Sequence, residues 1–204
     1  MSKCAFGKDQ VEYLGNIVSK HGVSADLTKL EAIAPWHIPT SVKALRGFLG
    51  LTGYYQKFIP QFGKIVSPLT VLTKKDNFKW STEATVAFNN LKQAMLSPQL
   101  LALPDFNKPF VIESDALRHG IGVMLQQEGG PITFTSKALC LRNQALSAYE
   151  REMLAIIHTV QKWQSYLVGN HFIIQTDHHS LKYFFRGKSS YPFSTKVDHQ
   201  ATWF

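Results

Sequence analysis

Two apolar segments of the chain end in the same way, on an aspartate. The first runs from Phe110 to Asp115 and the second from Phe172 to Asp177. Between them, residues 143–167 place apolar side chains at the spacing of an amphipathic α-helix. If that helix is a right-handed crossover, the two segments are parallel strands of one sheet, and both aspartates lie at its carboxyl edge. Open α/β sheets usually bind their ligands at that edge.

The crossover helix supplies a third carboxylate. At about 100° per residue, Glu152 falls beside Tyr149 and Ile156 on the flank of the apolar stripe, whereas Glu150 points further toward solvent. Carboxylates in close quarters repel one another unless a cation neutralises them. Three hard oxygen donors suit Mg²⁺ or Mn²⁺, and a pair of such ions can activate water for phosphodiester hydrolysis. Spacing alone leaves an ordinary alternative open, because strand-end aspartates often cap turns and helix glutamates are usually solvated.

The remaining periodicity predicts a chain of mixed class, α/β in its second half and α+β overall. Residues 10–24 are expected to form a β-hairpin, and the prolines at 98, 104 and 109 mark a connector between a helical unit and a sheet. The expected helices are 26–35, 41–55, 65–72, 82–96 and 180–185, and the expected strands are 110–114, 120–127, 132–136 and 172–176, with 128–131 as a turn.

Composition narrows the class of partner. Lys and Arg outnumber Asp and Glu by 22 to 14, a net charge of +8, which favours a polyanion such as nucleic acid. No apolar run reaches the roughly 18 residues that span a bilayer, and the first residues lack the apolar centre of a signal peptide. We therefore expect an intracellular protein, cytoplasmic or nuclear and not secreted, with no membrane partner. The two cysteines, Cys4 and Cys140, are expected to be reduced.

The second half resembles the ribonuclease H domain of gypsy-type LTR retrotransposons. The motifs that carry the resemblance are Lys108-Pro109-Phe110, Ser114-Asp115-Ala116, Gly120-Ile121-Gly122, the run from Tyr149 to Ile156, Thr176-Asp177-His178 and Ser180-Leu181-Lys182-Tyr183. The resemblance implies an RNase H-like mixed sheet. It also implies that Asp115, Glu152 and Asp177 bind two Mg²⁺ or Mn²⁺ ions and cleave the RNA strand of RNA–DNA hybrids.

The first half resembles the segment that precedes this domain in the same Pol polyproteins. Val11-Glu12-Tyr13-Leu14-Gly15 is similar to the primer-grip hairpin of reverse transcriptases, and the run from Leu45 to Leu51, with Tyr54-Tyr55 and Phe58-Ile59, is similar to their thumb and connection. The implied division is 1–25 for the end of the palm, 26–103 for the thumb and connection, and 104–204 for a C-terminally truncated RNase H-like domain. The rest of the Pol polyprotein is then an expected partner.

Three departures from the family pattern bear on activity. Leu117 stands where the family usually has serine, and the family's fourth acidic residue belongs to a segment beyond Phe204. The paired aspartates of the polymerase site occur nowhere in the chain, so we do not expect polymerase activity. A non-catalytic nucleic-acid-binding remnant therefore stays open as the alternative, as does a nuclease of the same fold that acts on DNA.

Several residues are weaker candidates for contacts with nucleic acid. They are Tyr13, Leu14 and Gly15 in the hairpin, and Lys162, His178 and Lys182 in the second half. The pair His178-His179 is not expected to form a metal site, because adjacent side chains in a loop rarely converge on one ion.

Overall fold

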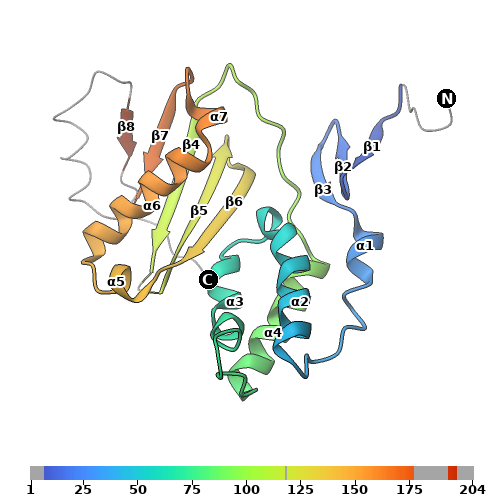
Figure 1. Ribbon diagram of the computed structural model, residues 1–204. Helices are drawn as coiled ribbons and strands as arrows, with labels where there is room; N and C mark the ends of the chain where they lie inside the picture. Colours follow the sequence, from blue (N-terminus) through green and yellow to red (C-terminus); the bar gives the residue numbers. More distant parts are fainter. Residues whose placement is uncertain (1–6, 118, 177–192, 197–204) are drawn as a thin grey trace.

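The computed structural model describes residues 7–117 and 119–176, together with the backbone of 193–196. The larger of two sheets has five strands. In Figure 1 it lies between helix α6 and a group of helices, and the small second sheet follows at the far side. The elements are β1 Gln10–Tyr13, β2 Asn16–Ser19, β3 Gly22–Ala25, α1 Leu27–Glu31, α2 Val42–Tyr54, η1 Gln56–Phe58, α3 Phe62–Val71, α4 Thr82–Leu96, β4 Phe110–Ala116, β5 Gly120–Gln127, β6 Gly130–Ala138, α5 Leu141–Gln144, α6 Ala148–Lys162, α7 Gln164–Leu167, β7 Phe172–Gln175 and β8 Phe193–Lys196.

The small sheet has three antiparallel strands in the order β1-β2-β3, where the sequence predicted a two-stranded hairpin. The first turn is as expected, because Leu14 and Gly15 both adopt positive φ, the geometry of a two-residue hairpin turn. The prediction missed the third strand. It is held from outside the local sequence, since Val23 and Leu101 exchange two backbone hydrogen bonds of 2.8 and 2.9 Å.

The helical unit follows the predicted pattern, with two differences at helix ends. Ser41 and Ser81 cap α2 and α4, which lie where the sequence predicted them. Asp26 caps α1 as expected, but that helix ends at Glu31 rather than near residue 35. The helix predicted from residue 65 begins at Phe62. Its N-cap residue, Gln61, has a left-handed backbone and makes no side-chain cap, so no sequence signal marks the start.

The first hydrophobic core joins these helices to the large sheet. Phe48, Phe58 and Phe88 are fully buried in it, and the rings of Phe48 and Phe88 lie 4.6 Å apart. Phe134 of β6 belongs to the same core, and Met124 of β5 packs against it. The helical unit and one face of the sheet therefore share their apolar contacts.

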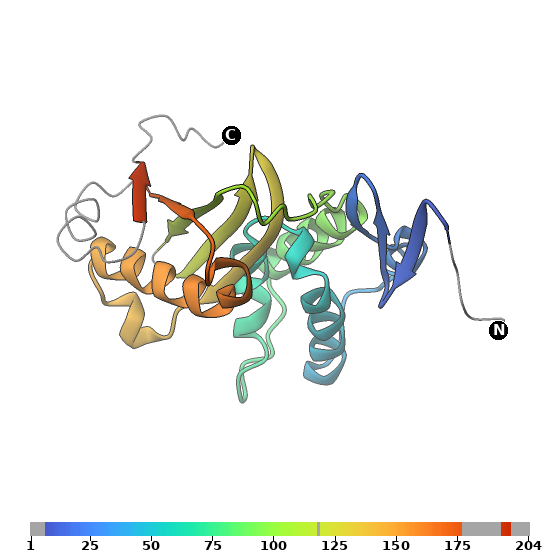
Figure 2. The ribbon, with the colours of Figure 1, turned by 90° about the horizontal axis from the view of Figure 1, so that it is seen from above.

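The large sheet has the strand order β6-β5-β4-β7-β8. Strands β4, β5 and β6 form an antiparallel meander, and their second turn lies at Glu128 and Gly129, narrower than the predicted 128–131. Strand β7 pairs parallel to β4, with Phe110 opposite Phe172, as the crossover argument required. Figure 2 shows α6 running along one side of this sheet and the helical unit on the other. The helix predicted at 180–185 lies outside the described residues.

The long helix expected over 143–167 is divided into α5, α6 and α7. Ser147 and Glu150 form a reciprocal capping box that begins α6, so the chain before it turns instead of continuing the helix. Trp163 leaves the helical conformation and separates α6 from α7. Gly169 has a φ of 79°, the left-handed conformation that commonly terminates a helix, as its position predicted.

The second core lies between α6 and the sheet. Phe110, Ile112 and Leu125 are fully buried against α6 and Trp163. In the described part of the chain no helix is long and apolar enough to cross a membrane. Cys140 is an exposed free thiol, whereas Cys4 lies outside the described residues.

Candidate active site

The Glu152 carboxylate is the buried polar centre of the site. Only 4% of the residue is exposed, and it lies in the second turn of α6, toward β4. Its Oε2 atom accepts a hydrogen bond from the Ser114 hydroxyl at 2.8 Å, and its Oε1 atom accepts one from the Ala116 amide at 2.7 Å. These donors flank Asp115 in β4. The helical-wheel prediction for Glu152 is confirmed, and Glu150 is exposed and occupied in the capping box.

Asp115 faces the other side of the strand. Side chains alternate along β4, so Ser114 is directed toward α6 and Asp115 away from it. Asp115 pairs across the sheet with Gly122, which pairs with Ser136, and the amide of Gly63 in α3 donates a 2.7 Å hydrogen bond to the Ser136 hydroxyl. The described site therefore draws on both faces at the end of β4.

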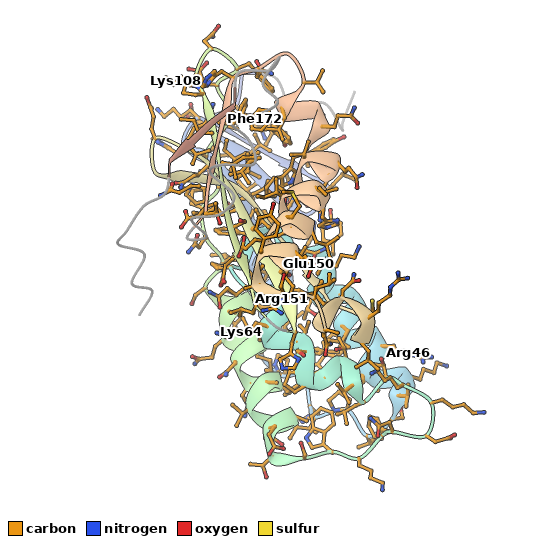
Figure 3. The ribbon with its side chains drawn as sticks, turned by 90° about the vertical axis from the view of Figure 1, so that its left-hand side faces the viewer. Arg46, Lys64, Lys108, Glu150, Arg151 and Phe172 are labelled. Atoms are coloured by element: carbon orange, nitrogen blue, oxygen red, sulfur yellow. The ribbon has the colours of Figure 1, made fainter. Side chains whose placement is uncertain are left out.

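A cavity of about 240 Å³ opens beside Asp115. It lies between the first turns of α3 and the ends of the strands, and its lining includes Lys64, Leu117, His119 and Ser136. Figure 3 shows Lys64 on α3, with Glu150 and Arg151 marking the start of α6, all toward the end of the sheet nearer the helical unit. Lys108 and Phe172 mark the opposite end. Residues of the helical unit thus border the strand ends that carry Asp115.

Asp177, the third expected ligand, lies outside the described residues, as do His178 and Lys182. Gln175, the last residue of β7, pairs with Glu113, which precedes Asp115 by two positions, as Gln175 precedes Asp177. Among the residues that the structure describes, no group of three or more His, Cys, Asp or Glu side chains could hold a metal ion. The three-carboxylate arrangement therefore stays a prediction.

The described part of the donor set fits a hard divalent cation. Asp115 and Glu152 offer carboxylate oxygens, the ligand type that Mg²⁺ and Mn²⁺ prefer. Ser114 and Ala116 each donate to one Glu152 oxygen, and a carboxylate oxygen has lone-pair capacity for more than one partner. Fixing a ligand carboxylate through neighbouring hydrogen bonds is also how proteins orient metal ligands.

The weaker candidates lie in two separate places. Tyr13 and Leu14 are 65% and 68% exposed at the tip of the first hairpin, where the Tyr54 hydroxyl donates to the Leu14 carbonyl. At Gly15, an added Cβ would lie 3.2 Å from the Tyr55 hydroxyl, so close packing favours glycine there. Lys162 is on α6, and its ammonium donates to the Thr135 hydroxyl at 2.6 Å.

Sequence reasoning did not identify Ser114 as the partner of Glu152, or the contact between Gly63 and Ser136. Strand alternation could have placed Ser114 on the helix-facing side, because Phe110 and Ile112 precede it at even spacing. The Gly63 contact joins residues 73 positions apart, and no local pattern predicts it.

Comparison with known proteins identifies the family. Residues 80–174 match the RNase H-like domain found in reverse transcriptase. The chain is 40% identical over 186 residues to the retrovirus-related Pol polyprotein from transposon 297, and 40% identical over 195 residues to that from transposon gypsy, both of Drosophila melanogaster. These matches cover 90% and 89% of this chain. The chain belongs to the retrovirus-related Pol polyproteins of transposons.

This Pol chain corresponds to only part of those relatives, spanning 18% and 19% of their lengths. It is also 54% identical over 111 residues to an uncharacterized mitochondrial protein of Arabidopsis thaliana, a match that covers 53% of this chain and 70% of that protein. The matches to the transposon 297 and gypsy polyproteins confirm the expected family.

Solved structures confirm the fold of this Pol chain. The foamy viral protease-reverse transcriptase in complex with an RNA/DNA hybrid superposes with a TM-score of 0.80 at 19% identity, covering 97% of this chain and 30% of that one. A second foamy viral structure, in complex with double-stranded DNA, gives a TM-score of 0.79 at 17% identity, covering 96% of this chain and 38% of the other. The chain thus contains the RNase H-like domain of a retroelement Pol polyprotein, with the mixed sheet that its sequence predicted.

Proposed function

We propose that this chain is a metal-dependent ribonuclease H that cleaves the RNA strand of RNA–DNA hybrids, with Asp115, Glu152 and Asp177 as metal ligands. The observation that carries the proposal is the buried Glu152 carboxylate, held by donors on both sides of Asp115. A buried carboxylate is costly to place unless its oxygens are bound, and here the binding groups belong to the strand that carries a second acid. The foamy viral relative that was solved with an RNA/DNA hybrid supports the choice of substrate.

The chain's own residues would orient the acids and contact the substrate. Ser114 and Ala116 hold the Glu152 carboxylate at the end of β4, and Asp115 lies between these two donors in the same strand. Divalent ions bound to these acids would supply Lewis-acid chemistry and an activated water for phosphodiester hydrolysis, leaving a 3′-hydroxyl. Strand ends and the first turn of α3 border the cavity beside Asp115 and would limit where a strand of nucleic acid can lie.

The decisive experiment is cleavage of a labelled RNA–DNA hybrid in Mg²⁺ or Mn²⁺. We expect Asp115→Asn and Glu152→Gln to lose activity by at least about 100-fold, the usual scale for removal of a group that acts in the transition state. Glu150→Gln is the matched control, because it removes a carboxylate two positions away on the same helix and glutamine still supports a capping box. Equal rates for Glu152→Gln and Glu150→Gln would refute the proposal.

Leu117 favours one second candidate, a non-catalytic nucleic-acid-binding remnant. Its side chain is 41% exposed and lines the cavity beside Asp115, where the family usually has serine. If the chain is such a remnant, it binds the hybrid but does not cut it in either Mg²⁺ or Mn²⁺. Leu117→Ser is the direct test, because restored cutting would identify that side chain as the obstacle. Cleavage of duplex DNA in a parallel reaction would instead indicate a nuclease of the same fold that acts on DNA.

We also propose the division of the chain into 1–25, 26–103 and 104–204, with the remainder of the Pol polyprotein as a partner. Contacts with nucleic acid are proposed for the weaker candidates, Tyr13, Leu14 and Gly15 in the hairpin and Lys162, His178 and Lys182 in the second half. The exposed hairpin tip supports the first set of contacts, since an aromatic and a leucine at 65% and 68% exposure are available to a ligand.

A further inference from the structure

Three basic side chains gather on the α6 face of the sheet, at its β6 edge. His158 and Lys162 are four residues apart on α6, so they lie on the same flank of that helix. The Lys162 ammonium reaches β6, where it binds the Thr135 hydroxyl. Lys137 is two positions beyond Thr135, so both side chains are on one face of the strand. We call His158, Lys162 and Lys137 the basic patch.

The register of the sheet shows that this face is the one α6 covers. Lys137 is directly opposite Ile121, a residue of the second core that packs against α6. Burial lowers the pKa of the His158 imidazole, and the positive charges of Lys137 and Lys162 lower it further. The three groups are therefore close enough to act on one another.

None of the three basic groups forms an ion pair with a carboxylate within the described part of the chain. The ion pairs found there join Lys29 to Glu12 and Asp26, and Lys108 to Asp105 and Glu128. The Lys137 and Lys162 ammonium groups both lie near His158, so their positive charges repel each other, and folding alone gives no reason to gather them. An anion bound between α6 and β6 would remove this repulsion.

The basic patch is also near the proposed active site. Ala116, whose amide holds Glu152, is opposite Ile121, and Ile121 is opposite Lys137. Two strand spacings separate Ala116 from Lys137, a distance of about 10 Å. A polyanion with regularly spaced charges could contact both places at once, and the net charge of +8 favours such a partner.

We propose that Lys137, His158 and Lys162 form a binding site for the phosphate backbone of nucleic acid, beside the active site and at the β6 edge of the sheet. This inference rests on the proposed function and assigns to it a surface that holds the substrate away from the reacting atoms. The contact is with phosphates, so the affinity depends on charge and salt and not on base sequence.

The site also makes binding sensitive to pH. His158 is faced by Lys162 on its own helix and by Lys137 on β6, and no carboxylate pairs with any of the three in the described residues. Its pKa in the free protein is below the ordinary value, so the imidazole is neutral near pH 7. A bound phosphate favours the charged form, so binding takes up a proton and the affinity rises as the pH falls.

The test measures binding of a fluorescein-labelled RNA–DNA hybrid in EDTA, where metal-dependent cutting cannot occur, across a KCl series. Removal of one cation that binds a phosphate should lower the slope of log affinity against log salt by about 1. We expect a decrease of about 2 for Lys137→Gln with Lys162→Gln. Lys137→Gln alone is expected to lower the slope by about 1. Because the Lys137 side chain is exposed, this variant tests the site even if loss of the Thr135 contact disturbs the fold.

The matched control is Lys75→Gln with Lys79→Gln, which removes two exposed charges from the loop between α3 and α4 and should leave the slope unchanged. His158→Gln should abolish the gain in affinity between about pH 8 and pH 5. Unchanged slopes in the basic-patch variants would overturn the site, even in a chain that cuts normally. Lower slopes in a chain that does not cut would support the site while refuting the catalytic proposal.

Discussion

The hydrogen bond between Ser114 and Glu152 allows a quantitative test of how the site is built. Ser114→Ala removes the hydroxyl and leaves the Oε2 atom of a carboxylate, 4% exposed, without that donor. A hydrogen bond to a charged group contributes about 1.5–3 kcal/mol, and Ser114 is itself buried at 7% exposure, so water cannot easily replace it. We therefore expect the free energy of unfolding to fall by about 1.5–3 kcal/mol.

The assay is equilibrium unfolding in urea, followed by circular dichroism. With an m value of about 2 kcal/mol/M, the expected loss moves the midpoint down by about 0.75–1.5 M. Ser114→Thr keeps a hydroxyl at the same position and should recover most of the loss. Ser165→Ala, on the exposed surface of α7, is the control for removing a serine hydroxyl. A midpoint for Ser114→Ala within about 0.2 M of the wild-type value, a margin set by an effect of about 0.4 kcal/mol, would refute the reasoning.

Three further changes test other parts of the fold. Phe134→Ala, which removes a sheet side chain from the helical core, should lower the free energy of unfolding by about 3–5 kcal/mol in the same urea assay. An effect below about 1 kcal/mol would show that the helical unit and the sheet do not share a core. Gly22→Ala should lower the thermal midpoint measurably, because its φ is 138° and the new Cβ would lie 2.2 Å from the Leu101 carbonyl oxygen. The hydrogen bond from Thr28 lowers the pKa of Asp26, so the stability it contributes is present above the ordinary aspartate pKa and lost as pH falls through the lowered value. Asp26→Asn should flatten thermal midpoints measured across that acid range, and an unchanged acid slope would contradict the assignment.

The sequence predicted most of the elements because their signals are local. Ser41 and Ser81 mark helix starts, and the apolar run that begins at Phe110 marks a strand. The β4–β7 pairing followed from the handedness of crossover connections, which is a property of chain chirality and not of particular residues. Predictions failed where distant groups determine the result. Strand β3 depends on Leu101, and the start of α3 on a residue with no cap.

For the candidate site, the helical wheel was sufficient to select Glu152 over Glu150, because burial on a helix follows a fixed angle per residue. It could not identify what holds the carboxylate, since Ser114 is 38 positions away. The same limit applies to the cavity beside Asp115, whose walls come from α3 and from three strands. Side-chain identity can be read from the sequence, but surroundings made by tertiary packing cannot.

Because side chains alternate between the two faces of β4, residues from both halves of the chain form the proposed site. Ser114 holds Glu152 on the α6 face, whereas Asp115 lines a cavity whose opposite wall is α3. A cation shared by the two acids would therefore lie at the strand end, where both faces meet, and the helical unit would border it. Because Phe134 and the contact between Gly63 and Ser136 tie α3 to the sheet, a change in that packing would move one wall of the site without touching a carboxylate. The RNase H-like fold alone would then be insufficient for activity, and the preceding helices would be part of the catalytic unit.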